Sequence, residues 1–98
     1  MPAYVINDME VTNPELLEEY KKLSAPIVKQ FGGRFMARGG RVALLEGDWD
    51  PKRIVIIEFA TLEQAKAWAE SAEYAPAKRI RQQASKSRLI VVEGVGLP

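Results

Sequence analysis

Residues 53–60 read RIVIIEFA, a nearly continuous apolar run that only Glu58 interrupts after its first residue. Val and Ile are typical of strands, and a strand that is apolar at consecutive positions presents aliphatic side chains to both faces of its sheet. A nearly continuous apolar run of this kind is typical of a buried strand. The run therefore predicts a central strand, and the flanking sequence is interpreted around it.

Three further stretches have strand character. AYVINDMEV at residues 3–11 alternates in part, and SRLIVVEGV at 87–95 is rich in β-branched residues. RFMARGGRVALLEGDW, beginning at residue 34, predicts two short strands around Gly39 and Gly40, because paired glycines between β-compatible runs suit a tight hairpin turn. Residues 48–52, DWDPK, predict a second turn before the central strand.

The remaining segments predict helices. Asn13 can cap a helix whose first position is Pro14, and apolar residues recur at helical spacing up to about residue 31, although Pro26 should kink or tighten the last turns. Gly32 and Gly33 supply a residue able to adopt positive φ at its end. A capping box, Thr61 with Gln64, starts a second helix over residues 62–72, and a shorter helical piece spans 74–85.

This order of elements predicts one α+β domain over residues 1–98, a ferredoxin-like two-layer sandwich with an antiparallel sheet and two main helices on one face. The runs VALLE, IVIIEF and LIVV would leave the second sheet face apolar and bare. Exposed apolar patches of this kind mark interaction surfaces, so we expect a second copy to pack its sheet there and form a homodimer.

Composition excludes several kinds of chemistry. The chain has neither Cys nor His, so it holds no disulfide or thiolate nucleophile, and we expect no metal site and no bound cofactor. The 14 Lys and Arg against 13 Asp and Glu give no overall attraction to polyanions, and we expect no nucleic-acid partner. The N-terminus MPAYVINDMEV predicts neither a signal peptide nor a membrane span, so the expected location is cytoplasmic.

Several short motifs run in a characteristic order along nearly the whole chain. They are Tyr4, Asp8, GGRF at 32–35, RGG at 38–40, LEG at 45–47, IEF at 57–59, Ala65, Trp68, Tyr74 and Arg79 to Arg81. In this combination the chain resembles the domain of unknown function 1330 family. The resemblance implies a dimeric α/β barrel, in which the sheets of two ferredoxin-like subunits face one another. It implies no reaction, because that superfamily includes cofactor-independent monooxygenases, isomerases and haem-handling enzymes.

Glu58 is the candidate catalytic residue. A carboxylate within an apolar strand must face a polar cavity, pair with a cation, or bear the cost of desolvation. On the functional interpretation it faces the internal cavity and acts as a general base or as an acceptor that orients a ligand. On the structural interpretation it pairs with an arginine or is satisfied by backbone and water.

Other polar residues are candidates for ligand binding. Asp8 shares a side of the first strand with Tyr4, and Glu46 follows VALL, so two carboxylates from separate strands could divide acid and base roles. Arg34 and Arg38 are four residues apart in an extended stretch, which predicts that both project to one side and could hold an anion. Ion pairing or coverage of the hairpin is the structural alternative.

Aromatic residues complete the set of candidates. Tyr4 and Trp68 are candidate pocket walls, although the helical stripe on which Trp68 lies also favours packing in the core. Trp49 lies in a predicted turn, where it could fold over a pocket mouth or over the partner subunit. A basic stretch without acidic residues follows Tyr74 and is interpreted as a solvated helix face or a dimer rim, comprising Lys78, Arg79, Arg81, Lys86 and Arg88.

Two hypotheses about function remain open at this stage. In the first, the dimer encloses a pocket for a small anionic or aromatic compound and catalyses proton transfer or oxygenation without a cofactor. In the second, it is a non-catalytic ligand-binding or protein-interaction module. A cavity in which Glu58 converges with an arginine would favour the first hypothesis, and a tightly packed interior would favour the second.

Overall fold

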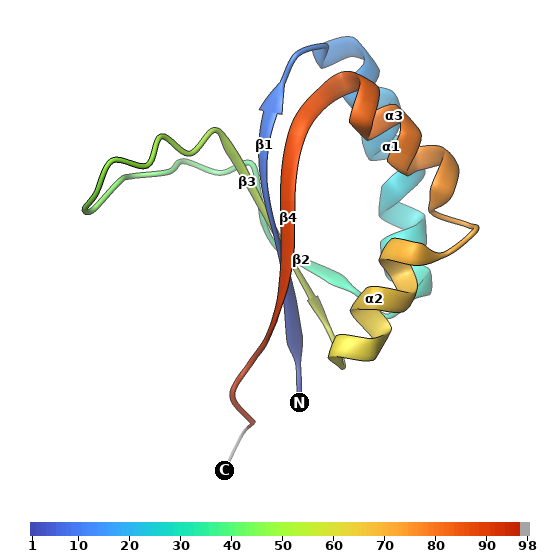
Figure 1. Ribbon diagram of the computed structural model, residues 1–98. Helices are drawn as coiled ribbons and strands as arrows, with labels where there is room; N and C mark the ends of the chain where they lie inside the picture. Colours follow the sequence, from blue (N-terminus) through green and yellow to red (C-terminus); the bar gives the residue numbers. More distant parts are fainter. Residues whose placement is uncertain (97–98) are drawn as a thin grey trace.

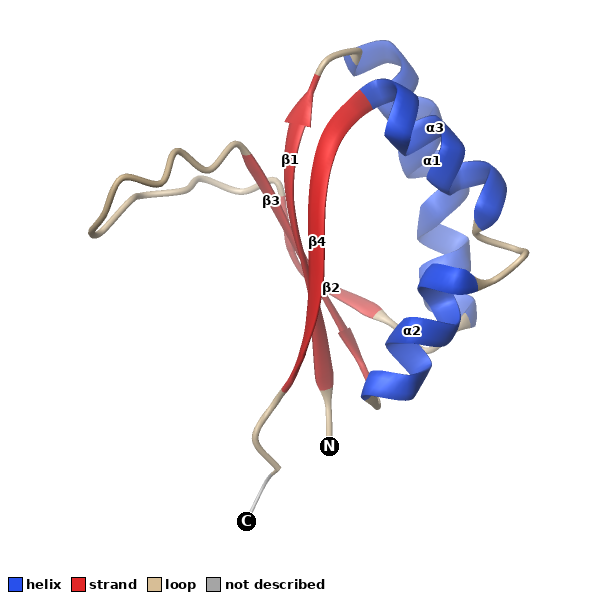
Figure 2. Ribbon diagram, in the orientation of Figure 1, coloured by secondary structure: helices blue, strands red, loops and turns tan. Residues whose placement is uncertain are grey.

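The computed structural model describes residues 1–96 as four strands and three helices. In chain order these are β1 (Ala3–Val11), α1 (Pro14–Gln30), β2 (Arg34–Arg38), β3 (Arg53–Phe59), α2 (Leu62–Glu70), α3 (Ala75–Ala84) and β4 (Ser85–Glu93). Figure 1 shows the helices together on one side of the sheet, and Figure 2 separates the two layers by colour. No helix within residues 1–96 is long and apolar enough to cross a membrane.

The sheet has the strand order β2-β3-β1-β4, and all neighbouring strands are antiparallel. The prediction that the RIVIIEFA run forms an inner strand is confirmed, because β3 pairs with both β1 and β2. The predicted ferredoxin-like α+β sandwich is likewise confirmed, and a third helix, α3, lies with the two main helices on the same face (Figure 2).

Local hydrogen bonds explain where the main helices begin and end. The Asn13 side chain accepts a hydrogen bond from the Leu16 N–H at 3.1 Å, as an N-cap does. Gly32, with φ of +77°, follows α1 and lets the chain turn, and Pro26 lies inside the helix without ending it. The capping box at α2 is half formed, because Thr61 caps Gln64 while the Gln64 side chain donates to the Phe31 carbonyl at 2.9 Å instead.

The core lies between the sheet and the helices. Along β1 and β3, alternate side chains such as Val5, Ile57 and Phe59 point to this side and are buried. Trp68 of α2 is 1% exposed, and its ring centroid lies 5.4 Å from that of Phe59 and 4.4 Å from that of Tyr74. Packing of this aromatic cluster holds α2 and the start of α3 against the sheet.

The prediction that VALLE forms a second hairpin strand is wrong. Residues 39–52 contain no strand and extend from the sheet as a long arm, drawn in green in Figure 1, on the side away from the helices. The physical reason is the pairing of β2, whose partner is β3 itself, so residues 41–46 have no strand to bond with. Gly39, where the chain leaves β2, has a φ of +74°, a conformation that glycine adopts readily.

The prediction that Arg34 and Arg38 project to one side is also wrong. Arg34 pairs with Glu58 and Arg38 with Val55, but the register shifts between Phe35 and Ala37. Met36 is therefore an additional residue, a β-bulge, and a bulge of one residue reverses the alternation of side chains. As a result, Arg34 lies on the sheet face away from the helices and Arg38 lies on the helix side.

Candidate functional site

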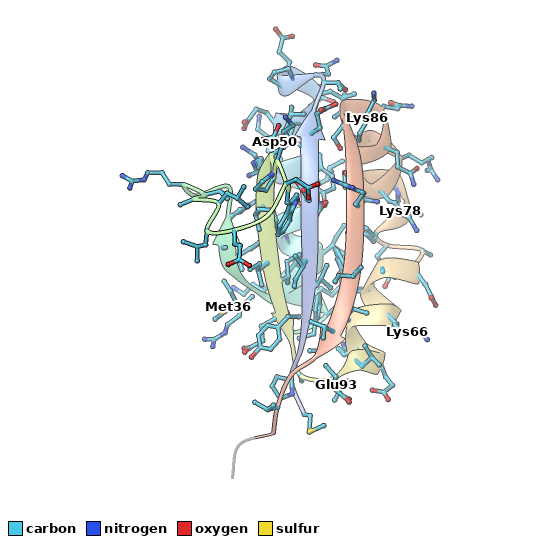
Figure 3. All side chains as sticks on the ribbon, turned by 60° about the vertical axis from the view of Figure 1, so that its left-hand side comes forward. Met36, Asp50, Lys66, Lys78, Lys86 and Glu93 are labelled. Atoms are coloured by element: carbon cyan, nitrogen blue, oxygen red, sulfur yellow. The ribbon has the colours of Figure 1, made fainter. Side chains whose placement is uncertain are left out.

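The sheet face away from the helices, called the open face below, combines aliphatic and polar side chains. In Figure 3 this face is turned toward the viewer, with the arm passing in front of it. Its exposed apolar residues include Ile90 at 63% and Val92 at 47%. The cross-strand registers place these residues with others on one surface, namely Tyr4, Ile6, Asp8, Ile54, Ile56 and Glu58.

Glu58 forms a polar cluster with Tyr4 and Arg34 on the open face. The Tyr4 hydroxyl donates to Glu58 at 3.2 Å, and Arg34 Nε donates to the other oxygen of the same carboxylate at 2.9 Å. Burial, and then the hydrogen bond to Glu58, raises the pKa of Tyr4. The internal cavity lies on the other side of the sheet, so the expectation that Glu58 faces this cavity is wrong. The chemical role of Glu58 stays a prediction.

Asp8 fixes the base of the arm to the open face. Its two oxygens accept from the Trp49 indole N–H at 3.1 Å and from the Lys52 backbone N–H at 2.9 Å, and Arg88 lies 3.6 Å away. The Lys52 N–H, followed by Trp49 and the nearby cations, holds the pKa of Asp8 below its usual range. Asp8 therefore contacts Trp49 and not Glu46, which is exposed on the arm.

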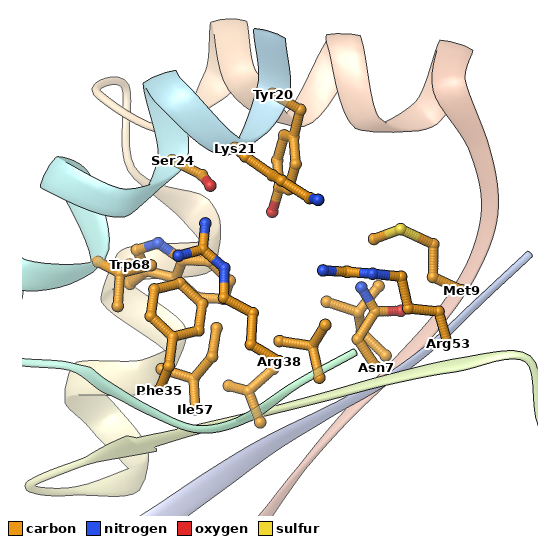
Figure 4. Close-up of a pocket in the computed structure, with 14 residues that line it drawn as sticks. Asn7, Met9, Tyr20, Lys21, Ser24, Phe35, Arg38, Arg53, Ile57 and Trp68 are labelled. Carbon is orange, nitrogen blue, oxygen red and sulfur yellow. The ribbon is translucent and has the colours of Figure 1, made fainter. Parts of the chain in front are cut away.

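A second group of polar and charged side chains surrounds a cavity between the sheet and α1 (Figure 4). Arg38 of β2 and Arg53 of β3 extend beneath α1, where Tyr20 and Lys21 face them. The deeper wall is formed by apolar residues and Asn7. The cavity measures about 20 Å³, which is room for one water molecule.

The mouth of this cavity is strongly cationic. The Arg38 guanidinium stacks over Phe35 at 4.1 Å from the ring centroid, and within residues 1–96 neither Arg38 nor Arg53 forms an ion pair. Burial, together with the nearby charge of Arg38, lowers the pKa of Arg53. Lys21 is already paired with Glu18 at 3.0 Å. Two guanidinium groups without carboxylate partners make this mouth suited to an anion.

Two buried polar atoms on the cavity wall lack a hydrogen-bond partner within the described chain. These are Asn7 Oδ1, in a residue 4% exposed, and Trp68 Nε1, in a residue 1% exposed. An unpaired buried donor or acceptor is costly, and in most proteins it is satisfied by water or by a bound group. The interior thus offers one acceptor and one donor to whatever occupies it.

A third buried polar group lies on α3. Arg81 is 5% exposed, and its Nε and Nη1 atoms have no partner within residues 1–96, so the interpretation of this basic residue as part of a solvated helix face is wrong. Nearby, the Tyr20 and Tyr74 hydroxyls lie 2.7 Å apart, and burial raises the pKa of Tyr74. Arg81 lies inward because it shares the buried face of α3 with Ala77 and Ala84.

The structure divides the predicted site residues between two sheet faces. Tyr4 and Trp68 lie on opposite sides of the sheet, so they cannot wall one pocket. Only Arg38 and Trp68 belong to the internal cavity, whereas sequence reasoning missed Asn7 and Arg53. The missed signal was the alternation in AYVINDMEV, which places Asn7 on the same side as Val5 and Met9 and makes it an inward polar residue.

The profile of one protein family, described as a domain of unknown function (DUF1330), matches residues 2–95. The chain belongs to the DUF1330 family. This match covers nearly the whole chain, so the resemblance noted in the sequence motifs is confirmed. No protein with a curated function matches the chain.

Solved structures of other proteins show the same fold. A protein of unknown function from Rhodopseudomonas palustris is 22% identical over 98% of this chain and 84% of that chain, with a TM-score of 0.73. A dimeric ferredoxin-like protein of unknown function from Jannaschia is 10% identical over 96% of this chain and 100% of that one, with a TM-score of 0.71.

An enzyme is also among the similar structures. SnoaB, a cofactor-independent oxygenase from Streptomyces nogalater, is 14% identical over 98% of this chain and 95% of that chain, with a TM-score of 0.60. At these levels of identity the likeness shows the ferredoxin-like fold and not a shared reaction.

Proposed function

We propose that this DUF1330 protein binds a small organic anion with an apolar body in the cavity between its sheet and α1. The observation that carries the proposal is the pair of guanidinium groups, Arg38 and Arg53, that have no ion-pair partner within residues 1–96 at the mouth of a largely apolar cavity. A planar carboxylate matches the forked donors of arginine, and apolar walls favour an aromatic or aliphatic body.

The wall of the cavity refines the ligand class. Asn7 Oδ1 needs a donor and the Trp68 indole N–H needs an acceptor, and the hydroxyl group of a ligand can act in either way, so it would satisfy one of these buried atoms. The carboxylate would remain near Arg38 and Arg53, and the hydroxyl would lie deeper. A small hydroxylated aromatic carboxylate has this arrangement of groups.

A ligand of this size requires the mouth to open, because about 20 Å³ admits only water. Arg38 is exposed and rests on the Phe35 ring, and we expect rotation of its side chain to widen the mouth of the cavity without a change in the sheet. The carboxylate of the ligand would then replace the aromatic ring as the partner of this guanidinium. Arg38 acts in this account as both lid and anion contact.

Catalysis of oxygenation or proton transfer without a cofactor is the second candidate function. The observation that favours it is the unpaired Asn7 oxygen and Trp68 N–H in the cavity of a fold that SnoaB also has. Glu58 cannot contact a ligand in this cavity, because it lies on the opposite side of the sheet. The nearly filled interior and the position of Glu58 favour ligand binding without catalysis. The other non-catalytic hypothesis is that the protein is a protein-interaction module.

We also propose that two copies pair through their open faces to form a homodimer. Support comes from the exposed Ile90 and Val92 on a face that no described helix covers, and from the dimeric ferredoxin-like fold of the Jannaschia protein. Replacing Ile90 with Asp places a charge on that apolar surface, where β4 forms the edge of the sheet, and we expect a monomer in sedimentation equilibrium. A dimer of unchanged affinity would contradict the face-to-face arrangement.

Binding of benzoate tests the ligand proposal, with benzamide as its neutral analogue. We expect calorimetry to detect benzoate and not benzamide, and Arg38→Gln to weaken benzoate binding about tenfold or more, since a hydrogen bond between charged groups contributes about 1.5–3 kcal/mol. Arg34→Gln is the matched control, because Arg34 lies on the same strand but on the open face. Equal binding of both compounds, or equal loss in both variants, would contradict the proposal.

A further inference from the structure

The arm, residues 39–52, carries large apolar side chains that are not buried by their own subunit. Val42 is 46% exposed, Leu44 48%, Leu45 96% and Trp49 53%. Every residue from Arg41 to Asp50 is exposed. Connections of this length without secondary structure are uncommon in compact domains and are usually functional or disordered.

The base of the arm is nevertheless fixed to the fold. The Gly39 N–H donates to the Ile54 carbonyl at 2.9 Å where the arm leaves the sheet. At the other end, Asp8 accepts hydrogen bonds from the Trp49 indole and from the Lys52 backbone. These contacts lie on both flanks of the arm, so the sheet itself sets the direction in which residues 40–48 extend.

That direction is toward the space in front of the open face. Figure 1 shows the arm leaving the sheet on the side opposite α1, α2 and α3, and Figure 3 shows it in front of β1 and β3. The arm and the exposed residues Ile90 and Val92 are therefore on the same side of the molecule. A partner that covers the open face would also meet the arm.

The reach of the arm exceeds the thickness of such an interface. An extended chain spans about 3.3 Å per residue, so the outgoing half of the arm, residues 39–45, reaches about 20 Å. Two sheets that pack face to face lie about 10 Å apart. The tip of the arm would accordingly pass the plane of the facing sheet and lie beside its edge.

We propose that each arm clasps the second copy of this chain, packing Leu44 and Leu45 against the edge of the partner's sheet. The inference rests on the proposed face-to-face homodimer. In a dimer with twofold symmetry both arms make this contact, so the apolar tip of each arm is covered by the other subunit. A helix or sheet face of the same subunit cannot cover the tip, because the arm extends away from both layers.

The charge of the arm favours a second copy over a polyanionic surface. Its two cations are Arg41 and Lys52, and its three acidic residues are Glu46, Asp48 and Asp50. An anionic membrane or a nucleic acid attracts segments with an excess of positive charge, which this segment lacks. Apolar residues between mixed charges are instead typical of the centre and rim of a protein interface.

The absence of cysteine from the chain allows a direct test with a single thiol. We expect Leu45→Cys to react with a soluble thiol reagent at least tenfold more slowly at concentrations where sedimentation shows a dimer than where it shows a monomer. Ala67→Cys, on the exposed side of α2, is the control and should react at one rate throughout. Protection that does not depend on protein concentration would show that the arm folds onto its own subunit and would overturn the inference.

Two variants separate the clasp from the dimer itself. We expect Leu44→Asp with Leu45→Asp to weaken dimerisation at least tenfold, whereas Leu23→Asp on α1, where Leu23 is 44% exposed, should not. A wild-type dimer that loses affinity on Ile90→Asp but not on the arm substitution would overturn the clasp and leave the dimer standing. A wild-type chain that stays monomeric would overturn both.

Discussion

Gly33 lies where the turn after α1 packs against the core, and it has no room for a side chain. A Cβ atom at this position would lie 2.7 Å from Phe59 Cε1 and 2.8 Å from Val28 Cγ1. Both neighbours are buried, so they cannot move into solvent. Glycine is therefore required here by close packing, and not by backbone conformation.

Gly33→Ala should lower the free energy of unfolding by about 1–3 kcal/mol, the usual cost of overpacking a core. Urea denaturation measures this difference. Gly40→Ala is the control, because nothing lies within 4 Å of the Cβ position there. Equal stability of Gly33→Ala and the wild type would contradict the tight packing between the turn and Phe59.

Asp8 gives the base of the arm a dependence on pH. Its pKa is lowered in the folded protein, so its contribution to stability is present above the ordinary pKa of about 3.9 and is lost as the pH falls through the lower folded value. We expect the indole N–H resonance of Trp49 to stay constant from pH 7 to about pH 4 and to move only in more acidic solution. In Asp8→Asn the resonance should already be shifted at pH 7, and a transition near pH 6 would be inconsistent with this anchor.

Residue type alone predicted part of the candidate site. Pairing with an arginine was the structural alternative for Glu58, and the structure contains such a pair, with Arg34 at 2.9 Å. The face on which each side chain lies could not be derived from spacing, since the bulge at Met36 reverses the alternation after Phe35. A one-residue irregularity thus moved Arg38 to the cavity and left Arg34 outside it.

At the scale of elements, α1 depends on a single side-chain cap at its start. Asn13→Ala should destabilise the protein by about 1 kcal/mol, because the Leu16 N–H loses its acceptor. Asn13→Asp keeps an acceptor and should retain most of the stability. Thermal unfolding of the three proteins compares them, and equal midpoints for Asn13→Ala and the wild type would show that the cap does not stabilise α1.

Most elements could be predicted from sequence because their signals are local. The Asn13 and Thr61 caps mark helix starts, and the apolar runs mark β1, β3 and β4. The arm could not be predicted, because VALLE has strand composition and only the tertiary arrangement decides whether a pairing partner exists. Its residues are apolar for a contact that lies outside the single subunit, in the account proposed here.

At the scale of the whole molecule, the sheet separates two surfaces with different properties. The helix side holds the cavity with Arg38, Arg53 and Asn7, and the open face holds the Tyr4, Glu58 and Arg34 cluster with its aliphatic surroundings. Ligand binding and dimerisation are therefore assigned to opposite faces. Substitutions on one face should leave the other property unchanged.

The two tryptophans of the chain report on these two faces separately. Trp68 lines the cavity with an indole N–H that has no hydrogen-bond partner within residues 1–96, and Trp49 is hydrogen-bonded to Asp8 beside the open face. The most direct measurement is a ¹H–¹⁵N spectrum of both indole resonances during a titration with benzoate, with Trp49→Phe used for assignment. Binding in the cavity predicts that the Trp68 resonance moves and the Trp49 resonance does not. An unmoved Trp68 resonance, or a shift confined to Trp49, would contradict it.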